Sequence, residues 1–237
     1  MSLIEVTGLS KQFGGVHALK DVAVSMQAGE TLGMIGPNGS GKTTFVNVIT
    51  GQLRADSGSL QFDGQEIRRE ASHRLAQRGL TRTYQAVRVF AGLTVQKNIG
   101  AARLLLATQS VSGTDLAELI AWLRLDTVLG KEAGSLTLFE QRRLELLMRL
   151  LQRPKLIMLD EPVGGLAVTE VREMLLLLQQ LKARTSIFVI EHTMRVIREL
   201  ADRVVVLMAG EKIADGPPAE ILRDKRVIEQ YLGTANA

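Results

Sequence analysis

Hydrophobic and polar residues follow two different periods along this chain. Near the N-terminus, alternation over residues 3–9 and 22–26 predicts two strands joined by polar turns. After residue 155, short apolar runs alternate with longer amphipathic stretches, which indicates strand–helix units. The strands expected in this second half are residues 156–159, 186–190, 203–208 and 212–214, and the helices are residues 169–183 and 194–201. This order predicts an α/β fold with a parallel sheet.

The first half of the chain adds further strands and short helices. Residues 31–35 form an apolar run that predicts a buried strand, and a helix should follow over residues 42–50. Residues 59–62 predict another strand within a turn-rich region. A polar helix near residues 69–78 should precede a strand that ends at Gln85.

A helix-prone stretch over residues 95–151 lacks strand patterns. Because strands stand on both sides of it, we expect a helical subdomain inserted into a sheet core. One further helix should begin with Pro217 as its first residue, and a last helix should end near Leu232. The expected organisation is one domain over residues 1–237, in which residues 1–88 and 152–237 form the core with an antiparallel β part and residues 89–151 form the helical subdomain.

Composition excludes several classes of protein and site. The balance of 46% hydrophobic and 23% charged residues is that of an ordinary globular chain. There is no cysteine, which excludes disulfides and thiolate metal sites. The net charge of +4 accompanies no basic run with interleaved aromatics, so we expect no nucleic-acid partner. No run approaches the roughly 18 apolar residues that cross a bilayer, and the first residues lack the apolar core of a signal peptide. We therefore expect a soluble chain.

The strongest chemical signal lies between the strand at residues 31–35 and the following helix. The sequence Gly36-Pro-Asn-Gly-Ser-Gly-Lys42-Thr43-Thr44 matches G-x-x-x-x-G-K-[ST] in its confirming strand-to-helix context. The glycines let backbone N–H groups converge on an anion, and the helix N-terminus adds partial positive charge. A plain glycine turn would not need Lys-Thr at its end. We expect Lys42 to bind the terminal phosphates of ATP and the Thr43 hydroxyl to bind Mg²⁺. The predicted nucleotide-binding residues here are Gly36, Asn38, Gly39, Ser40, Gly41, Lys42, Thr43 and Thr44.

Two carboxylates follow the apolar strand at residues 156–159. Adjacent residues of a strand point to opposite faces, so Asp160 and Glu161 should have different roles. Asp160 is expected on the Mg²⁺ side, and Glu161 is expected to polarise the attacking water. An ordinary acidic loop is the alternative, and the phosphate-binding loop argues against it because ATP chemistry needs an acid here.

Two further polar residues stand at strand ends. His192 follows the strand at residues 186–190, at the edge where a γ-phosphate would lie. A lone histidine is more often structural, as we expect for His73. Gln85 precedes the helical insert, where it can bridge Mg²⁺, water and a moving subdomain. We therefore assign Glu161, His192 and Gln85 as catalytic candidates, and Thr43, Gln85 and Asp160 as metal ligands.

With these residues placed, the chain resembles the ATPases of ABC transporters over nearly its whole length. Gln85 in Arg82-Thr-Tyr-Gln matches the family's Q-loop, and Glu191-His192 matches its H-loop. Phe13 matches the aromatic residue that stacks on adenine in this family. The segments most similar to the branched-chain and hydrophobic amino acid uptake subgroup are residues 79–85, 87–95, 190–194 and 227–233.

The resemblance implies a P-loop NTPase fold with a RecA-like parallel sheet core. It also implies an ATP-hydrolysing motor subunit of an importer, bound peripherally at the cytoplasmic face of the inner membrane. The implied partners are integral membrane permease subunits, a second ATPase chain and, indirectly, a periplasmic or extracellular binding protein. Residues 87–93 are the candidate docking segment, with a buried loop as the alternative. The rival functions are a non-transport ABC ATPase, another P-loop enzyme such as a GTPase, and a weakly hydrolysing regulatory subunit.

The elements that this family donates to a partner chain are altered here. The signature, normally Leu-Ser-Gly/Tyr-Gly-Gln, reads Leu136-Thr-Leu-Phe-Glu140. Phe139 replaces a glycine that lets bare backbone approach phosphate, and Glu140 adds a negative charge near an anion. Thr137 and Glu140 nevertheless have the spacing of a capping box. Ala167 stands where the family's D-loop usually has Asp or Asn. These changes predict a heterodimer with a different ATPase chain, whose intact signature completes this chain's site.

Overall fold

The computed structural model describes residues 2–104, 113–225 and 227–228. In chain order the elements are β1 (Ser2–Phe13), β2 (Val16–Gln27), β3 (Thr31–Ile35), α1 (Lys42–Ile49), β4 (Ser57–Phe62), β5 (Gln65–Glu66), α2 (Ser72–Gln77), β6 (Leu80–Arg82), α3 (Val95–Leu104), α4 (Gly113–Trp122), α5 (Leu138–Leu150), β7 (Leu156–Asp160), α6 (Val168–Leu181), β8 (Ser186–Ile190), α7 (Met194–Leu200), β9 (Arg203–Met208), β10 (Glu211–Gly216) and α8 (Pro218–Ile221), with 3-10 helices at Asp126–Val128 and Ala133–Ser135. No helix among these described residues is long and apolar enough to cross a membrane.

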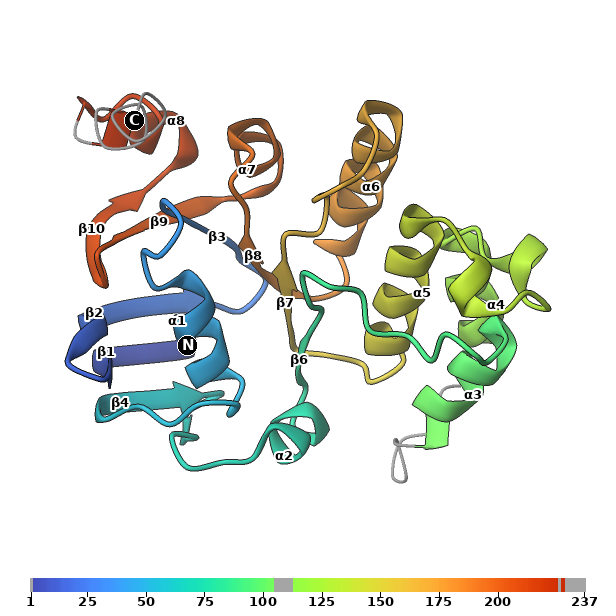
Figure 1. Cartoon of the computed structure of the whole chain (residues 1–237), viewed down its shortest axis with the longest axis horizontal. Coiled ribbons are helices and arrows are strands. Elements are labelled where there is room, and N and C mark those ends of the chain that lie inside the picture. The colour runs from blue at the N-terminus through green and yellow to red at the C-terminus, as the bar shows by residue number, and fades with distance from the viewer. Residues whose placement is uncertain (1, 105–112, 226, 229–237) are drawn as a thin grey trace.

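A largely parallel sheet forms the centre of the molecule (Figure 1). Its strand order is β10-β9-β3-β8-β7-β6, and all neighbouring pairs are parallel except β10 and β9. Every residue of β3, β7 and β8 is buried, as expected for central strands that are covered on both faces. The carboxyl ends of these strands therefore meet at one edge of the sheet, and this edge carries the candidate site.

The two faces of the parallel sheet are covered by different layers. Alternate residues of β7 separate them, because Leu156 and Met158 belong to one hydrophobic cluster and Ile157 and Leu159 to the other. The first cluster also contains apolar side chains of α1 and of the antiparallel sheet β2-β1-β4-β5. The second contains side chains of α5, α6 and α7. The predicted α/β fold with a parallel core and an antiparallel β part is thus confirmed.

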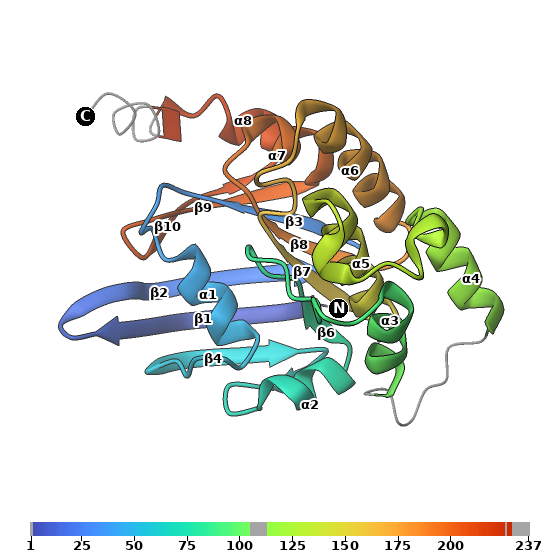
Figure 2. The same cartoon turned by 45° about the vertical axis from the view of Figure 1, so that its right-hand side comes forward.

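The helical part of the chain lies at the opposite end of the molecule from the β1–β2 hairpin (Figure 2). It consists of α3, α4, the two 3-10 helices and α5. Helix α5 packs on α3 and shares the second hydrophobic cluster with β7 and α6. The helical insertion therefore lies between β6 and β7, as the sequence predicts. Its exact bounds at residues 89–151 stay a prediction.

Several predicted boundaries differ from the structure. Strands β1 and β2 extend to Phe13 and Val16 because register shifts along the hairpin break the period of two in their outer halves. The strand expected to end at Gln85 ends at Arg82, after which the chain leaves the sheet. Pro217 is extended and Pro218 is the first helical residue, because a residue before proline is biased away from the α region. The helix end near Leu232 lies outside the described residues.

Candidate functional site

The loop between β3 and α1 has a shape that only glycine permits at two positions. A Cβ atom on Gly36 would lie 2.2 Å from the carbonyl oxygen of Leu207. A Cβ atom on Gly41 would lie 2.4 Å from the carbonyl oxygen of Ala18, and Gly41 has a positive φ of 105°. The loop backbone is therefore pressed against β2 and β9, and it leaves its other side for a ligand.

A second turn supports the loop from behind. The N–H of Gly210 donates to the carbonyl of Ser40 (3.1 Å), and the N–H of Lys20 donates to the carbonyl of Gly210 (2.8 Å). Asn38 and Gly39, by contrast, are exposed at the tip of the loop. The sequence motif predicts the loop itself, but the support from Gly210 depends on the tertiary fold.

Lys42 spans the inside of this loop at the first position of α1. Its Nζ donates to the carbonyl oxygens of Gly36 (2.7 Å) and Pro37 (2.9 Å). Burial lowers the pKa of Lys42, and the nearby carboxylates of Glu161 and Asp160 partly oppose this shift. The first N–H groups of a helix have no intrahelical partners, so an anion bound here would meet backbone donors and the Lys42 ammonium together.

Asp160 lies at the end of β7 and is paired with an arginine that the sequence did not single out. Its Oδ2 accepts from Nη2 of Arg82 at 2.8 Å, and both side chains are largely buried. Burial raises the pKa of Asp160, while Arg82 acts in the opposite direction. The sequence around Arg82 holds no local signal for the partner of its side chain.

Glu161 directly follows β7, and its backbone departs from the extended conformation of the strand. Its φ of +49° is left-handed, a conformation that costs a non-glycine residue about 1–2 kcal/mol. The Nε2 of Gln85 donates to its Oε2 at 2.9 Å, and Nδ1 of His192 lies 3.6 Å from its Oε1. The three catalytic candidates therefore converge, although they come from segments far apart in the sequence. Asp160 and Glu161 have separate partners, as predicted, although Glu161 lies one residue beyond the strand and has a left-handed backbone.

A buried glutamate holds the loops on either side of this cluster. Glu191 is fully buried, and its carboxylate accepts from the N–H groups of Val163 (3.3 Å) and Thr193 (3.4 Å). Burial raises the pKa of Glu191, and these two hydrogen bonds oppose the shift. Its place beside His192 is visible in the sequence, but its direction into the core is not.

A cavity of about 470 Å³ opens beside the cluster. The side chains that line it include Gln85, Glu161 and His192. On its other side lie Leu138 and Gln141 of α5, with Gly165 of the loop after β7. The cavity thus lies between the sheet edge and the start of the signature helix, where a phosphoryl group and water can approach Glu161.

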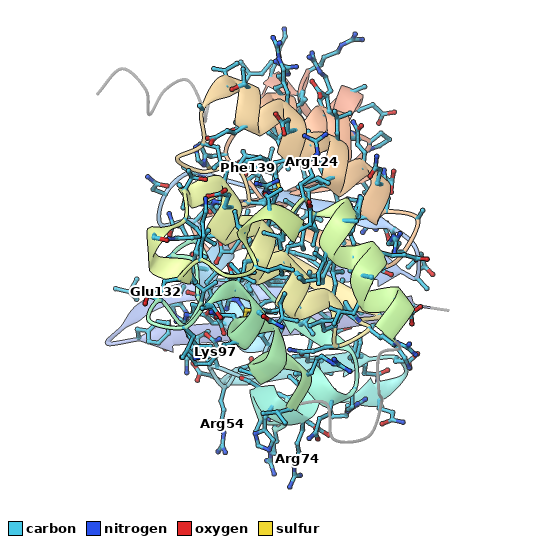
Figure 3. The ribbon with its side chains drawn as sticks, turned by 90° about the vertical axis from the view of Figure 1, so that its right-hand side faces the viewer. Arg54, Arg74, Lys97, Arg124, Glu132 and Phe139 are labelled. Atoms are coloured by element: carbon cyan, nitrogen blue, oxygen red, sulfur yellow. The ribbon has the colours of Figure 1, made fainter. Side chains whose placement is uncertain are left out.

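The altered signature begins helix α5 with a complete capping box, as predicted. The N–H of Glu140 donates to Oγ1 of Thr137 (3.2 Å), and the N–H of Thr137 donates to Oε2 of Glu140 (2.8 Å). Phe139 does not present its ring at the surface. Its side chain is 7% exposed at the start of α5 (Figure 3), and the guanidinium of Arg143 lies 4.4 Å from the ring centroid. The apolar residue exposed at this helix start is Leu138.

Ala167 stands just before helix α6 and offers no capping side chain. Its N–H donates to Oε2 of Glu170 at 2.9 Å, but its own side chain has no oxygen that could accept from a backbone N–H of the helix. The neighbouring carbonyl of Gly164 accepts from Nη2 of Arg142 at 2.6 Å. The D-loop is therefore attached to the signature helix within the same chain.

Phe13 lies at the end of β1, away from the buried cores. Its side chain is 47% exposed, and the ammonium of Lys11 lies 5.3 Å from the ring centroid. A ring this exposed is free to stack on a planar ligand, while a core role is excluded. The adenine contact of Phe13 stays a prediction.

The candidate metal ligands fit a Mg²⁺ that is shared with a nucleotide. Among the described residues there is no cluster of three or more histidine or carboxylate side chains that could hold a metal by itself. Mg²⁺ is commonly bound through one or two carboxylates, while substrate phosphates and several waters supply other ligands. One hydroxyl (Thr43), one amide (Gln85) and one carboxylate (Asp160) match that requirement.

Comparison with known proteins places these features in a family. The family model described as "ABC transporter" matches residues 19–164, and a second, "Branched-chain amino acid ATP-binding cassette transporter", matches residues 211–237. The branched-chain amino acid transport ATP-binding protein BraF of Pseudomonas aeruginosa is 34% identical, with 98% of each chain covered. LivG of Escherichia coli is 33% identical at the same coverage.

Solved structures agree with the sequence relatives. A nucleotide-free ATP-binding cassette from an ABC transporter superposes with a TM-score of 0.88 and 27% identity, covering 98% of this chain and 99% of the other. An ADP-bound cassette superposes with a TM-score of 0.87 and 29% identity at the same coverage. The phosphate-binding loop, the acids after β7 and these matches agree, and the chain belongs to the ABC transporter family as one of its ATP-hydrolysing, ATP-binding cassettes.

Proposed function

We propose that this chain is the ATP-hydrolysing motor subunit of an ABC importer for branched-chain or other hydrophobic amino acids. The convergence of Gln85 and His192 on Glu161 carries the hydrolytic part of the proposal. The substrate class rests on the names of BraF and LivG and on the family model at residues 211–237. Import, and a peripheral place at the cytoplasmic face of the membrane, are the direction and location that the sequence resemblance implies.

The proposed reaction is an in-line attack of water on the γ-phosphate of ATP. The backbone of the phosphate-binding loop and Lys42 bind the phosphates and stabilise the charge that develops on them. Glu161 orients the water and accepts its proton, while Gln85 holds the carboxylate in place. His192 donates a hydrogen bond to the γ-phosphate. When bound, Mg²⁺ supplies charge neutralisation at the β- and γ-phosphates, with Thr43, Gln85 and Asp160 as its protein-side groups.

The substitution Glu161→Gln tests this assignment. Loss of a positioned base typically lowers the rate by 10²–10⁴, so turnover should fall by that factor while nucleotide binding persists. Steady-state ATPase and nucleotide titration on the same preparation measure the two effects. Glu173→Gln is the control, since Glu173 pairs with Arg124 at the surface of the helical part. Near-normal turnover of Glu161→Gln would show that another group activates the water.

The proposed docking site for the permease is a groove between the core and the helical part. One section, of about 320 Å³, is lined by α2, β6 and Tyr84, and an adjoining section of about 200 Å³ is lined by Val89 and Phe90. Arg149 and Gln152 line both sections. Phe90 is 53% exposed, which favours docking over the alternative of a buried loop for residues 87–93.

A buried asparagine holds this docking segment in shape. The N–H of Phe90 donates to Oδ1 of Asn98 (2.8 Å), and Nδ2 of Asn98 donates to the carbonyls of Phe90 (3.1 Å) and Leu93 (3.2 Å). Arg54 and Arg74 project from the end of the molecule that carries α2 (Figure 3). An apolar segment held by Asn98, with the basic side chains of Arg88 and Arg149 lining the same section of the groove, suits a cytoplasmic permease loop with apolar and acidic residues.

The altered signature supports a heterodimer with a second ATPase chain. Glu140 and Thr137 already satisfy each other's backbone N–H groups, so this helix start has less to offer an incoming phosphate. The partner's intact signature would complete this chain's own site, and a binding protein outside the membrane would deliver the cargo. ATPase activity should therefore be low alone and rise with the second chain. Strong turnover by the isolated chain, unchanged in Glu140→Gln, would contradict the heterodimer. That substitution keeps the capping box and removes the charge.

A further inference from the structure

Arg82 uses its whole guanidinium group in the interior of the protein. It is the last residue of β6, and its backbone pairs with Met158 in the neighbouring strand β7. Nη2 donates to Oδ2 of Asp160 at 2.8 Å, and Nη1 donates to Oδ1 of Asn47 at 2.6 Å. Nε donates to the carbonyl of Thr83 at 3.3 Å. The side chain is 6% exposed, so these bonds are shielded from water.

These contacts connect two parts of the proposed site. Asn47 belongs to α1, the helix that begins with Lys42 and continues directly from the phosphate-binding loop. Asp160, the proposed metal-side acid, is the last residue of strand β7. One rigid, planar side chain therefore sets the position of the carboxylate relative to the helix that follows the loop. Only Oδ2 of Asp160 is bound, and the described residues give its other oxygen no hydrogen-bond partner.

Arg82 also lies at the edge of the docking groove. Its guanidinium carbon is 4.5 Å from the ring centroid of Tyr84, and that of Arg88 is 3.7 Å from the same ring. The hydroxyl of Tyr84 accepts from Nε2 of Gln52 at 2.6 Å. The same arginine thus contacts the acid on one side and the segment leading to Gln85 on the other.

We propose that Arg82 is a positioning residue that holds Asp160 in the geometry needed for Mg-nucleotide binding. This inference rests on the proposed metal-side role of Asp160. Stability alone gives little reason for such a pair, because a buried ion pair is often no better than a well-packed apolar pair. The fork geometry instead fixes one oxygen of the carboxylate and leaves the second for a metal or its water ligands.

Nucleotide affinity measured with and without Mg²⁺ tests the role directly. A fluorescent ATP analogue is titrated into the full chain, first in EDTA and then over a series of Mg²⁺ concentrations. In Arg82→Gln the Mg²⁺ concentration needed for half-maximal tightening should rise at least about tenfold, while the affinity in EDTA stays within twofold of the unsubstituted chain. Arg82→Lys keeps the charge and loses the fork, and should recover only part of the effect.

Arg78→Gln is the matched control, because it removes an arginine–carboxylate pair with Glu70 in the same region but away from Asp160. Its Mg²⁺ dependence should equal that of the unsubstituted chain. Should Arg82→Gln fail to fold, Asn47→Ala removes the shortest bond that holds the guanidinium, and it should shift the Mg²⁺ dependence in the same direction. An unchanged Mg²⁺ dependence in folded Arg82→Gln or, if that does not fold, in Asn47→Ala would overturn the proposal. Tighter Mg²⁺ binding would also overturn it, since that would show that Arg82 competes with the metal.

A double substitution separates this inference from the proposed function. If Arg82 acts through Asp160, then Arg82→Gln should have no further effect on Mg²⁺ dependence in an Asp160→Asn background. Additive effects would show that the arginine acts by another route and would refute the proposal. If the unsubstituted chain shows no Mg²⁺-dependent affinity at all, the ATPase assignment fails before Arg82 is considered. The two failures are therefore distinguishable.

Discussion

Phe139 offers the sharpest test of how the altered signature is built. Phe139 is only 7% exposed, and it belongs to the hydrophobic cluster that includes Leu146 and Leu147 of the same helix. Removing a buried phenylalanine to alanine costs about 3–5 kcal/mol of stability. Stacking by the guanidinium of Arg143 adds about 0.5–1 kcal/mol. Phe139→Ala should therefore lower the free energy of unfolding by about 3.5–6 kcal/mol.

The assay is equilibrium unfolding in urea, followed by circular dichroism. Leu138→Ala is the matched control, since Leu138 is the preceding residue of the same helix and is 38% exposed. It should cost less than about 1.5 kcal/mol. Equal losses for the two variants would refute the buried position of Phe139. The result also decides how the substitution Phe139→Gly, which restores the family's glycine in the signature, is interpreted. Glycine in place of alanine in a helix costs about 1 kcal/mol more, so this variant would lose activity through instability alone.

Two other predictions concern a buried acid and the phosphate-binding loop. Burial raises the pKa of Glu145 from 4.5 to about 7. The contribution of Glu145 to the free energy of unfolding should therefore be fully present below pH 4.5 and should be lost as pH rises through 7. Glu145→Gln should remove on the order of 3 kcal/mol of this pH dependence; an unaltered profile of unfolding free energy against pH would contradict it. Gly41→Ala should weaken Mg-ATP binding at least about tenfold, because its Cβ would meet the carbonyl of Ala18 at 2.4 Å. Gly39→Ala, with no atom within 4 Å, should lose less in the same titration.

Local sequence determined the fold class and most of the chemistry. A phosphate-binding loop is continuous in the chain, so the residues from Gly36 to Thr44 reveal both its shape and its ligand. The apolar strand before Asp160 and Glu161 likewise shows where the acids stand, because period and burial are readable within a few residues. The capping box of Thr137 and Glu140 is equally local, and the structure confirms it.

Tertiary packing decided the features that no short segment contains. Arg82 and Asp160 are 78 residues apart, and only the alignment of β6 beside β7 brings them together. The burial of Phe139 depends on which face of α5 meets the core, although its spacing of seven and eight residues from Leu146 and Leu147 was a usable signal. The end of β6 also escaped prediction, because the chain leaves the sheet after Arg82 although the neighbouring strand β7 continues to Asp160. A sequence thus determines which groups are available, while the directions of their side chains depend on contacts between distant segments.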